Sequence, residues 1–331
     1  MPVRGRDGGV RHAITKVASV LIVLVLVLGG VAGYFVLVRP GMGTTAVATS
    51  KISASSIPAT YAGIGDPFTS SELASINGQP LSNYQTAGEM LLNGSIANEV
   101  ALGRANHYQP LVVNGKPSVV VLQAISCSDC AMNRWAQALS LAAFGNFTAL
   151  YVGYSASGTN HVTTLYWGQD NYTAAQGVTF GSSYASKYLN FYAVDYDSPV
   201  ITGGFQWTTL AYLAQHAPNS TWQAVTAFME NASNALGNKA PPTDTQLWGS
   251  SVWFGGIAVI LGNSTSVTGT AAPVSHLSHE SALAQISGFS DQYAWSNYAA
   301  ADVYIAGVCP SLTGPPPVCS LPAIVSLEGR V

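Results

Sequence analysis

Two closely spaced cysteines, Cys127 and Cys130, are the residues of this sequence best suited to chemistry. In a C-x-x-C pair the first thiolate can attack a disulfide, and the second cysteine can then resolve the mixed disulfide that forms. Cys127 is therefore the expected nucleophile, and Cys130 is the expected resolving residue of a thiol–disulfide exchange. Two other interpretations stay open, namely a static disulfide between the two residues and one half of a zinc site.

The residues around this pair oppose the redox interpretation. Asp129 lies between the two cysteines, and its charge, if ionised, would disfavour a neighbouring thiolate. Ser126, and not Trp, precedes Cys127. In an acidic medium a thiol with a pKa of about 7 would be almost wholly protonated, so exchange would be slow.

The other two cysteines, Cys309 and Cys319, lie close together near the end of the sequence, around a run of prolines. Their spacing is unlike the C-x-x-C half of a zinc site, which disfavours zinc. A structural disulfide between them is the favoured interpretation, and closing so short a loop would contribute about 3 kcal/mol of stability. A redox relay from this pair to the C-x-x-C is the alternative.

No other pattern indicates a cofactor or metal. The order His276-x-x-His279-Glu280 differs from the H-E-x-x-H of metalloproteases, and Ser278 in its middle is typical of a helix start. The sequence contains no G-x-S-x-G, phosphate-loop or kinase signature. We therefore expect no cofactor and no bound metal.

The elements around the C-x-x-C form a strand–helix–strand unit. Residues Ser118 to Ile125 are nearly all apolar, as in a central strand that is buried on both faces. Residues Ala131 to Phe144 have apolar side chains at helical spacing, Gly145 suits a helix C-terminal cap, and Ala149 to Tyr154 follow as a strand. This unit is typical of thioredoxin-like proteins, and it places Cys127 at a helix N-terminus, where a thiolate is favoured.

The rest of the sequence completes an α/β fold. Apolar runs and turn residues predict the following further elements: a strand at Asn190 to Val194, helices at Thr208 to His216 and Thr221 to Leu236, a hairpin of Val252 to Leu261 with Ser266 to Thr270, a helix capped by Ser278, and a helix over Asp291 to Ala306. We expect a thioredoxin-like core around residues 110–155 and 250–290, with a helical insertion at about 155–250.

The stretch from Lys116 to Phe147 resembles an archaeal family, domain-of-unknown-function family 929, whose members carry a strand, C-P-Y-C, A-x-x-R-W-A and R-F-G-N-F in this order. The segments Ser182 to Asp195 and Cys309 to Cys319 are also similar to family motifs. The matching residues are Cys127, Cys130, Arg134, Trp135, Ala136, Phe144, Gly145, Asn146 and Phe147. The resemblance implies a membrane-anchored, outward-facing, thioredoxin-like protein, and it implies no substrate.

The sequence departs from this pattern at two places. The interior of the C-x-x-C is Ser128-Asp129, and not an aromatic residue and proline. Thioredoxin-like proteins also place a cis-proline before the hairpin, whereas Ala258 stands at the corresponding position here. A cis bond before a residue other than proline costs about 2.5–4 kcal/mol, so this departure affects catalysis more than the fold.

The N-terminal region indicates a membrane anchor. Residues 17–38 carry no charge and would span about 33 Å as a helix, which is enough for the hydrocarbon core. Basic residues precede this run, so residues 1–16 are expected in the cytoplasm, 39–60 as a flexible stalk and 61–331 outside, in a single-pass topology. A cleaved signal peptide, with Ala46-Val47-Ala48 near its cleavage site, is the alternative.

Charged residues make up only 8% of the composition, with 12 Lys and Arg against 15 Asp and Glu. This excludes a nucleic-acid binder, which needs dense positive charge. A surface with few carboxylates loses little when acid protonates them, so we hypothesise an acidic environment. A glycan coat is a compatible explanation, with six candidate acceptors at Asn93, Asn146, Asn171, Asn219, Asn231 and Asn263.

The sequence therefore favours an extracytoplasmic, membrane-anchored thiol–disulfide oxidoreductase whose partners are membrane lipid at residues 17–38 and protein thiols or disulfides. A non-catalytic cell-surface domain with structural disulfides is the alternative. A component of an assembled surface layer or filament is a third interpretation.

Overall fold

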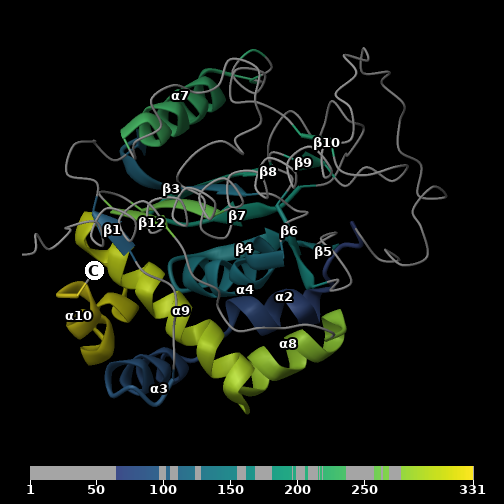
Figure 1. Ribbon diagram of the computed structural model, residues 1–331, viewed down its shortest axis with the longest axis vertical. Coiled ribbons are helices and arrows are strands. Elements are labelled where there is room, and N and C mark those ends of the chain that lie inside the picture. Colours follow the sequence, from purple (N-terminus) through teal and green to yellow (C-terminus); the bar gives the residue numbers. More distant parts are fainter. Residues whose placement is uncertain are drawn as a thin grey trace, which may run out of the picture. The chain divides into compact units, whose positions relative to one another are not determined.

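The fold was analysed in a computed structural model of the chain (Figure 1). The structure describes residues 65–96, 102–104, 111–123, 128–154, 162–167, 181–195, 197–198, 206–207, 215, 217, 219–235, 257–261, 264–267 and 277–330. The predicted anchor at 17–38 and stalk at 39–60 lie outside these residues. Among the described residues, no helix has both the length and the apolar composition that a membrane crossing requires.

A mixed sheet forms the centre of the domain, and β3 (Lys116–Gln123) is its central strand. β8 (Asn190–Asp195) pairs parallel with β3, from Ser118 opposite Asn190 to Gln123 opposite Asp195. On the other side, β11 (Ile257–Leu261) pairs antiparallel with the same residues of β3. β12 (Ser264–Val267) and β1 (Leu102–Arg104) continue the sheet antiparallel, and β2 (Val112–Val113) pairs with the start of β3.

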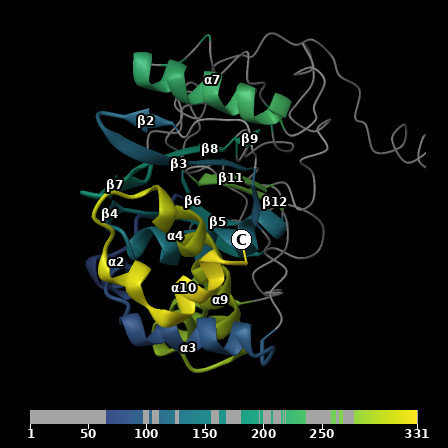
Figure 2. The ribbon, with the colours of Figure 1, turned by 90° about the vertical axis from the view of Figure 1, so that its left-hand side faces the viewer.

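Helices cover both faces of this sheet. α4 (Ser128–Ala142) and α9 (Gln292–Val308) pack against each other on one face, while α7 (Ser220–Ala235) lies across the other face (Figures 1 and 2). The ring of Trp222 in α7 lies 5.7 Å from the ring of Tyr192 in β8, in an edge-to-face contact. The predicted mixed α/β class is confirmed.

Four shorter helices pack around α9 and α4. They are α2 (Ser70–Asn77), α3 (Leu81–Leu92), α8 (His279–Gly288) and α10 (Pro322–Glu328). Ser278 caps α8 through a bond from the Ser281 amide, as the sequence predicts, and Asp291 caps α9 in the same way. Every α9 residue from Ser296 to Val308 is buried, so this helix is a central core element with no exposed side over that length.

Three short two-stranded sheets complete the described fold. β5 (Tyr151–Tyr154) pairs antiparallel with β6 (Thr163–Tyr166). β4 (Asn146–Ala149) pairs with β7 (Ser183–Ala185), and β9 (Asp197–Ser198) pairs with β10 (Gln206–Trp207). Asn77 of α2 binds the backbone of Phe147 in both directions, at 2.8 and 2.9 Å, which fixes α2 to β4.

The predicted helical insertion at 155–250 contains strands as well as a helix in the part that the structure describes. These residues form β6, β7, β8, β9 and β10, and the long helix among them is α7. β8 belongs to the central sheet, so this part of the chain contributes to the core. Tyr and Thr around 162–195 favour strands, but Ser and Gly are interspersed among them and the sequence gives no clear alternation there.

The predicted hairpin near residue 260 is confirmed with shifted bounds. Leu261 at the end of β11 is paired with Ser264 at the start of β12, so the connection is shorter than the sequence suggests. The predicted helix at 208–216 lies almost entirely outside the described residues.

Gly145 is required for close packing, and not for a left-handed cap. A Cβ atom at this position would lie 2.4 Å from the Ala185 carbonyl oxygen and 2.7 Å from the Ser186 Cβ. Its φ is not among the positive values that the described residues show. Gly145 lies at the helix end, as predicted. Glycine is required there because the β7 segment approaches too closely to leave room for a Cβ atom.

We expect Gly145→Ala to lower the free energy of unfolding by about 1–3 kcal/mol, because the added methyl group meets backbone that cannot rotate away. Thermal unfolding followed by circular dichroism measures this change. Gly288→Ala is the matched control, since a Cβ there meets Ser290 only at ordinary contact distances of 3.5 and 3.8 Å. Equal stability of both variants would contradict the packing argument.

Candidate functional site

The C-x-x-C lies at the junction of the central strand and a buried helix. Val119, Val120 and Val121 of β3 are buried, as predicted for a strand covered on both faces. α4 begins at Ser128, so Cys130 is in its first turn. Cys127 lies outside the described residues, and of Cys130 the structure describes the backbone only. The first turn of a helix carries free amide groups and the positive end of the helix dipole, which favour a thiolate.

This junction is at the edge of the sheet where β3 and β8 both end. Gln123 is paired with Asp195 on one side and with Ile257, the first residue of β11, on the other. Ligand and active sites of open α/β sheets are found at the carboxyl ends of parallel strands. Ala258, the position at which the sequence comparison expected a cis-proline, is opposite Leu122 at the same edge. No cis peptide bond is present among the described residues.

The helix that follows the C-x-x-C is buried on all sides over most of its length. The sequence predicts a helix with apolar side chains at helical spacing, and the polar residues Asn133, Arg134, Gln137 and Ser140 are buried together with the apolar ones. The prediction of an amphipathic helix is therefore wrong about exposure, although the helix itself is confirmed. The polar side is covered by elements distant in sequence, among them α9, α2 and β6.

The hairpin strand β6 holds the first two turns of α4 through three hydrogen bonds. Thr164 Oγ1 donates to the Ala131 carbonyl at 2.7 Å, and Trp135 Nε1 donates to the Thr163 carbonyl at 3.0 Å. The Arg134 guanidinium donates through Nη1 to the Leu165 carbonyl at 2.8 Å. Because three consecutive residues of β6 take part, the hairpin fixes the helix rotation directly after the C-x-x-C.

His279 is a buried core residue that packs against two aromatic rings. Its ring lies 4.6 Å from the ring of Phe68 and 5.8 Å from that of Trp135, and its Nε2 is 3.4 Å from Glu72 Oε1. Burial lowers the pKa of His279, while Glu72 and Glu280 act in the opposite direction. His276 lies outside the described residues. Within the described residues, no three His, Cys, Asp or Glu side chains are grouped as a metal would require.

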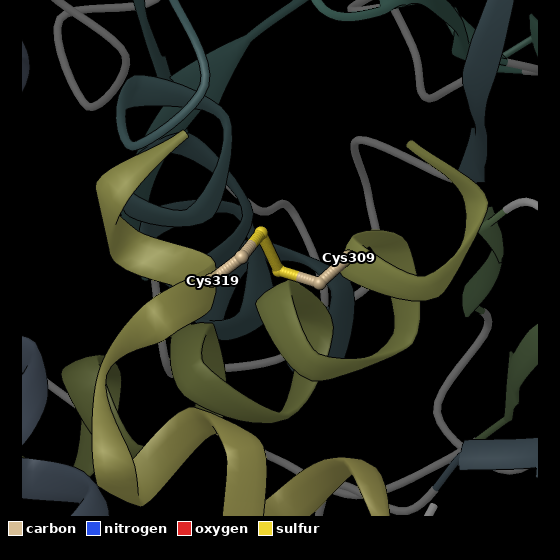
Figure 3. The surroundings of a disulfide bond; sticks show 2 residues. All are labelled: Cys309 and Cys319. Carbon is tan, nitrogen blue, oxygen red and sulfur yellow. A yellow bond between two sulfur atoms is a disulfide. The ribbon is translucent and has the colours of Figure 1, made fainter. Parts of the chain in front are cut away.

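The second pair of cysteines forms a disulfide, as the sequence predicts. Cys309, directly after α9, is bonded to Cys319 in the 3-10 turn Pro317–Ser320 that precedes α10 (Figure 3). Both residues are buried. The bond joins the end of the central helix to the last helix, which is a structural role, and it leaves neither sulfur as a free thiol for a relay.

Three of the candidate glycosylation residues are exposed in the structure. Asn93 follows α3, Asn146 starts β4 and Asn219 precedes α7, and all three have exposed side chains. Asn231 is within α7, where only its backbone is described, and Asn171 and Asn263 lie outside the described residues. Modification of these residues stays a prediction.

Sequence reasoning missed the buried polar residues around α4 and α9. Asp302 on α9 is fully buried, and neither of its carboxyl oxygens has a hydrogen-bond partner. Gln137 of α4 lines a small cavity with Val119, Val121 and Val308. Arg134 is the third such residue, and the sequence gave no signal of its burial, because arginine is rarely fully buried.

These features define a mixed α/β domain with a C-x-x-C at the end of its central strand. Residues 106–246 match the family model "Domain of unknown function (DUF929)", which agrees with the resemblance found in the sequence. The matched region covers less than half of the chain and includes β3, the C-x-x-C, α4, β8 and α7. No curated protein and no solved structure matches the chain.

Proposed function

We propose that this domain is thioredoxin-like and exchanges thiols and disulfides through Cys127 and Cys130. The observation that carries the proposal is the position of the C-x-x-C between the central strand β3 and the N-terminus of α4. In a cysteine pair at such a junction, the helix terminus favours the thiolate that exchange requires.

The order of elements supports the thioredoxin-like assignment. With the short strands β4, β5, β6, β7, β9 and β10 and the helix α8 set aside, the order is β3, α4, the parallel strand β8, α7, the antiparallel hairpin β11–β12 and α9. A thioredoxin-like domain has this succession, with a central strand before the cysteine pair and helices on both faces of the sheet. The other described elements are then additions to the common core, namely the strands β1, β2, β4, β5, β6, β7, β9 and β10 and the helices α2, α3, α8 and α10.

The proposed reaction moves two electrons. The Cys127 thiolate attacks a substrate disulfide, which forms a Cys127–substrate mixed disulfide and releases the other substrate sulfur as a thiolate. The Cys130 thiolate then attacks the Cys127 sulfur, which forms the Cys127–Cys130 disulfide and releases the second substrate thiolate. The substrate is reduced and the pair is oxidised, and the reverse sequence oxidises a dithiol substrate.

Trapping of the mixed disulfide tests this function. In Cys130→Ser the resolving step is blocked, so proteins from the same cell envelope should accumulate as adducts on Cys127 that a reductant removes. The matched control is Cys127→Ser/Cys130→Ser, in which adducts should be absent. Adducts of equal amount in the control, or no adducts with either variant, would contradict the proposal.

A non-catalytic surface domain is the second candidate, and one observation favours it. The helix after the C-x-x-C is buried over most of its length, and a cysteine pair held against a buried helix is less accessible to a substrate. The reduction potential of the Cys127–Cys130 pair separates the two functions. Structural disulfides have potentials below about −300 mV, whereas exchange proteins are less negative.

We further propose that residues 17–38 anchor the domain in a membrane, with residues 1–16 in the cytoplasm and residues 61–331 outside. The uncharged run and the basic residues before it support this proposal. Protease added to intact cells should then digest the domain while a fragment containing residues 17–38 stays with the membrane. A freely secreted chain that begins near Thr49 would indicate a cleaved signal peptide.

A further inference from the structure

We propose that Asn93 carries an N-linked glycan that is attached to the folded domain, while Asn146 is left unmodified and Asn219 is modified much less. The donor is a sugar activated by a phosphate group, and the transfer takes place outside the membrane. The inference rests on the proposed topology, in which residues 61–331 lie outside, and it is independent of the cysteine pair. It distinguishes three acceptor tripeptides that the sequence alone makes equivalent.

The tripeptide Asn93-Gly94-Ser95 lies on the surface, in the turn that ends α3. All three residues are exposed, and Ile96 directly after them is buried, which fixes the turn to the core. Gly94 has a φ of 78°, a conformation that glycine adopts without strain, and the Ser95 amide donates to the Met90 carbonyl at 2.9 Å. A transferase can therefore bind the whole tripeptide without disturbing the core.

The side chain of Asn93 has its nitrogen free while its oxygen is bound. Asn93 Oδ1 also accepts from the Ser95 amide, at 2.9 Å, and no group in the described residues accepts from Nδ2. The nitrogen lone pair of an amide is held by resonance, so the nitrogen becomes a nucleophile only when it loses a proton. A hydrogen bond to the oxygen draws charge toward it, which makes this proton easier to remove. The turn therefore presents Asn93 in a state suited to transfer.

The proposed transfer exchanges one bond for another. Asn93 Nδ2 attacks the first carbon of the donor sugar, which forms an N–C bond. The bond between that carbon and the phosphate oxygen breaks, and the phosphate leaves with the electron pair. One proton of the amide passes to a base of the transferase, so no oxidant or reductant takes part.

The tripeptide Asn146-Phe147-Thr148 has the same sequence pattern but is built into the core. Phe147 is only 2% exposed, and its ring lies 5.1 Å from that of Tyr184 and 5.9 Å from that of Trp167. Its backbone amide donates to Asn77 Oδ1 at 2.9 Å, and β4 is paired with β7. A transferase would have to separate these strands and remove Phe147 from the core, so Asn146 stays unmodified in the folded domain.

The tripeptide Asn219-Ser220-Thr221 forms the start of α7. Asn219 Oδ1 accepts from the Trp222 amide at 3.1 Å, so this side chain caps the helix. Ser220 and Thr221 belong to the first turn of α7. Access to this tripeptide opens the cap and the first turn, and loss of such a cap shifts a local equilibrium by roughly fivefold. We expect occupancy at Asn219 to be lower than at Asn93 by at least this factor.

The glycan adds hydration to a surface that has few charges. Charged residues make up 8% of the chain, so ionised side chains hold little water on the surface of the domain. Sugar hydroxyls do not titrate between acid and neutral pH, so their hydration stays the same where carboxylates lose their charge. The modification therefore suits the hypothesis of an acidic environment.

Mass spectrometry of the full-length chain, isolated from its native membrane and digested with trypsin, tests this inference. Trypsin separates the three tripeptides, because residues 52–104 contain Asn93, residues 135–187 contain Asn146 and residues 188–239 contain Asn219. Fragmentation of each peptide assigns the sugar to one residue. The expected result is sugar on Asn93 and none on Asn146. An unmodified Asn93, or occupancy of Asn146 or Asn219 equal to that of Asn93, would overturn the inference.

Variants of the turn test the tripeptide and its conformation separately. Ser95→Ala removes the hydroxyl that defines the acceptor tripeptide and should abolish the sugar, whereas Ser95→Thr should retain it. Gly94→Ala keeps the tripeptide pattern but strains the backbone at a φ of 78°, so occupancy at Asn93 should fall severalfold. A Cβ at Gly94 meets no atom within 4 Å, so altered packing does not explain such a fall.

Gly115→Ala is the matched control for the strained turn. Gly115 has a φ of 76° and an equally open Cβ position, and it lies in another turn, between β2 and β3. Occupancy at Asn93 should stay as in the wild type. Sugar retained in Ser95→Ala, unchanged occupancy in Gly94→Ala or an equal fall in Gly115→Ala would each overturn the inference. The peptide map of the wild type decides if a variant does not fold.

Failure of the glycan, of the topology and of the exchange function give different results. An unmodified Asn93 in a domain that protease reaches on intact cells would contradict the glycan alone. An unmodified Asn93 in a domain that the protease does not reach would contradict the glycan and the topology together. Trapping of adducts on Cys127 tests the exchange function and does not depend on the sugar.

Discussion

Asp302→Asn should raise the temperature of unfolding at pH 7 and leave it nearly unchanged at pH 3. The wild-type side chain is fully buried on α9, and neither carboxyl oxygen has a hydrogen-bond partner. Asp302 Oδ2 would lie 3.1 Å from a Cβ built at Gly88 of α3, so the carboxyl group is enclosed between two packed helices. Burial raises the pKa of Asp302 well above its ordinary value.

The direction of the pH effect follows from this raised pKa. The folded protein holds the Asp302 proton more tightly than the unfolded chain does, so the unfolded chain releases it first as the pH increases. Stability from this residue is complete below the ordinary aspartate pKa of about 3.9 and falls as the pH rises toward the folded-state pKa. The nearby phenols of Tyr84 and Tyr298 also have raised pKa values through burial, so they stay neutral over this range.

The expected gain for Asp302→Asn at pH 7 is the free energy that keeps the buried carboxyl group protonated there, about 1.4 kcal/mol for each pH unit between the unfolded-state and folded-state pKa values, or roughly 2–4 °C in the unfolding temperature per kcal/mol. Calorimetry at pH 3, 5 and 7 measures it. Asp66→Asn makes the same chemical change at an exposed residue and should leave the pH dependence as it is. A variant that is less stable than the wild type at pH 7 would show that the carboxylate is stabilised there.

This behaviour agrees with the hypothesis of an acidic environment. A protein that buries a neutral carboxyl group gains stability in acid, and a surface with few ionised groups loses little there. We therefore expect the near-ultraviolet dichroism of the domain to persist down to about pH 3.

Removal of the Cys309–Cys319 disulfide should cost about 3 kcal/mol. The bond joins the end of α9 to the turn before α10, and Val318, Ile324 and Leu327 around it are buried. Without the bond, the unfolded chain gains conformational freedom and the α10 segment is held by packing alone. Cys309→Ala/Cys319→Ala should therefore unfold at a temperature lower by roughly 6–12 °C.

The corresponding alanine variant of Cys127 and Cys130 is the control, since it leaves the tail intact. Digestion of the unreduced wild type should yield a peptide pair linked through Cys309 and Cys319. If Cys309→Ala/Cys319→Ala lowers the free energy of unfolding by less than about 1 kcal/mol, packing and not the disulfide stabilises this part of the fold. A peptide linking either residue to Cys127 would instead restore the redox relay.

The central part of the fold was predictable because its signals are local. The run of β-branched residues before the C-x-x-C identifies β3, the helical spacing after it identifies α4, and Ser278 marks the start of α8. The pairing of Cys309 with Cys319 also followed from their proximity in sequence. None of these inferences required knowledge of contacts between distant segments.

The exposure of each element was not predictable, because it depends on segments that are distant in sequence. Asn133 and Arg134 belong to residue types that are mostly exposed, yet α9 and β6 cover them. Asp302 gave no signal at all, since a single acidic residue in an alanine-rich helix is usually exposed. The strands β6 and β7 were missed because their own composition does not indicate a strand. They form strands by pairing with β5 and β4.

The separation of α4 and α9 along the chain has a consequence for biosynthesis. The helix after the C-x-x-C ends at Ala142, and the helix that covers it begins only at Gln292. At a translation rate of about 5–20 residues per second, α9 is synthesised on the order of 10 s after α4. Cys127 and Cys130 are synthesised before Cys309 and Cys319, so during that interval they can pair with each other without competition from the two later cysteines.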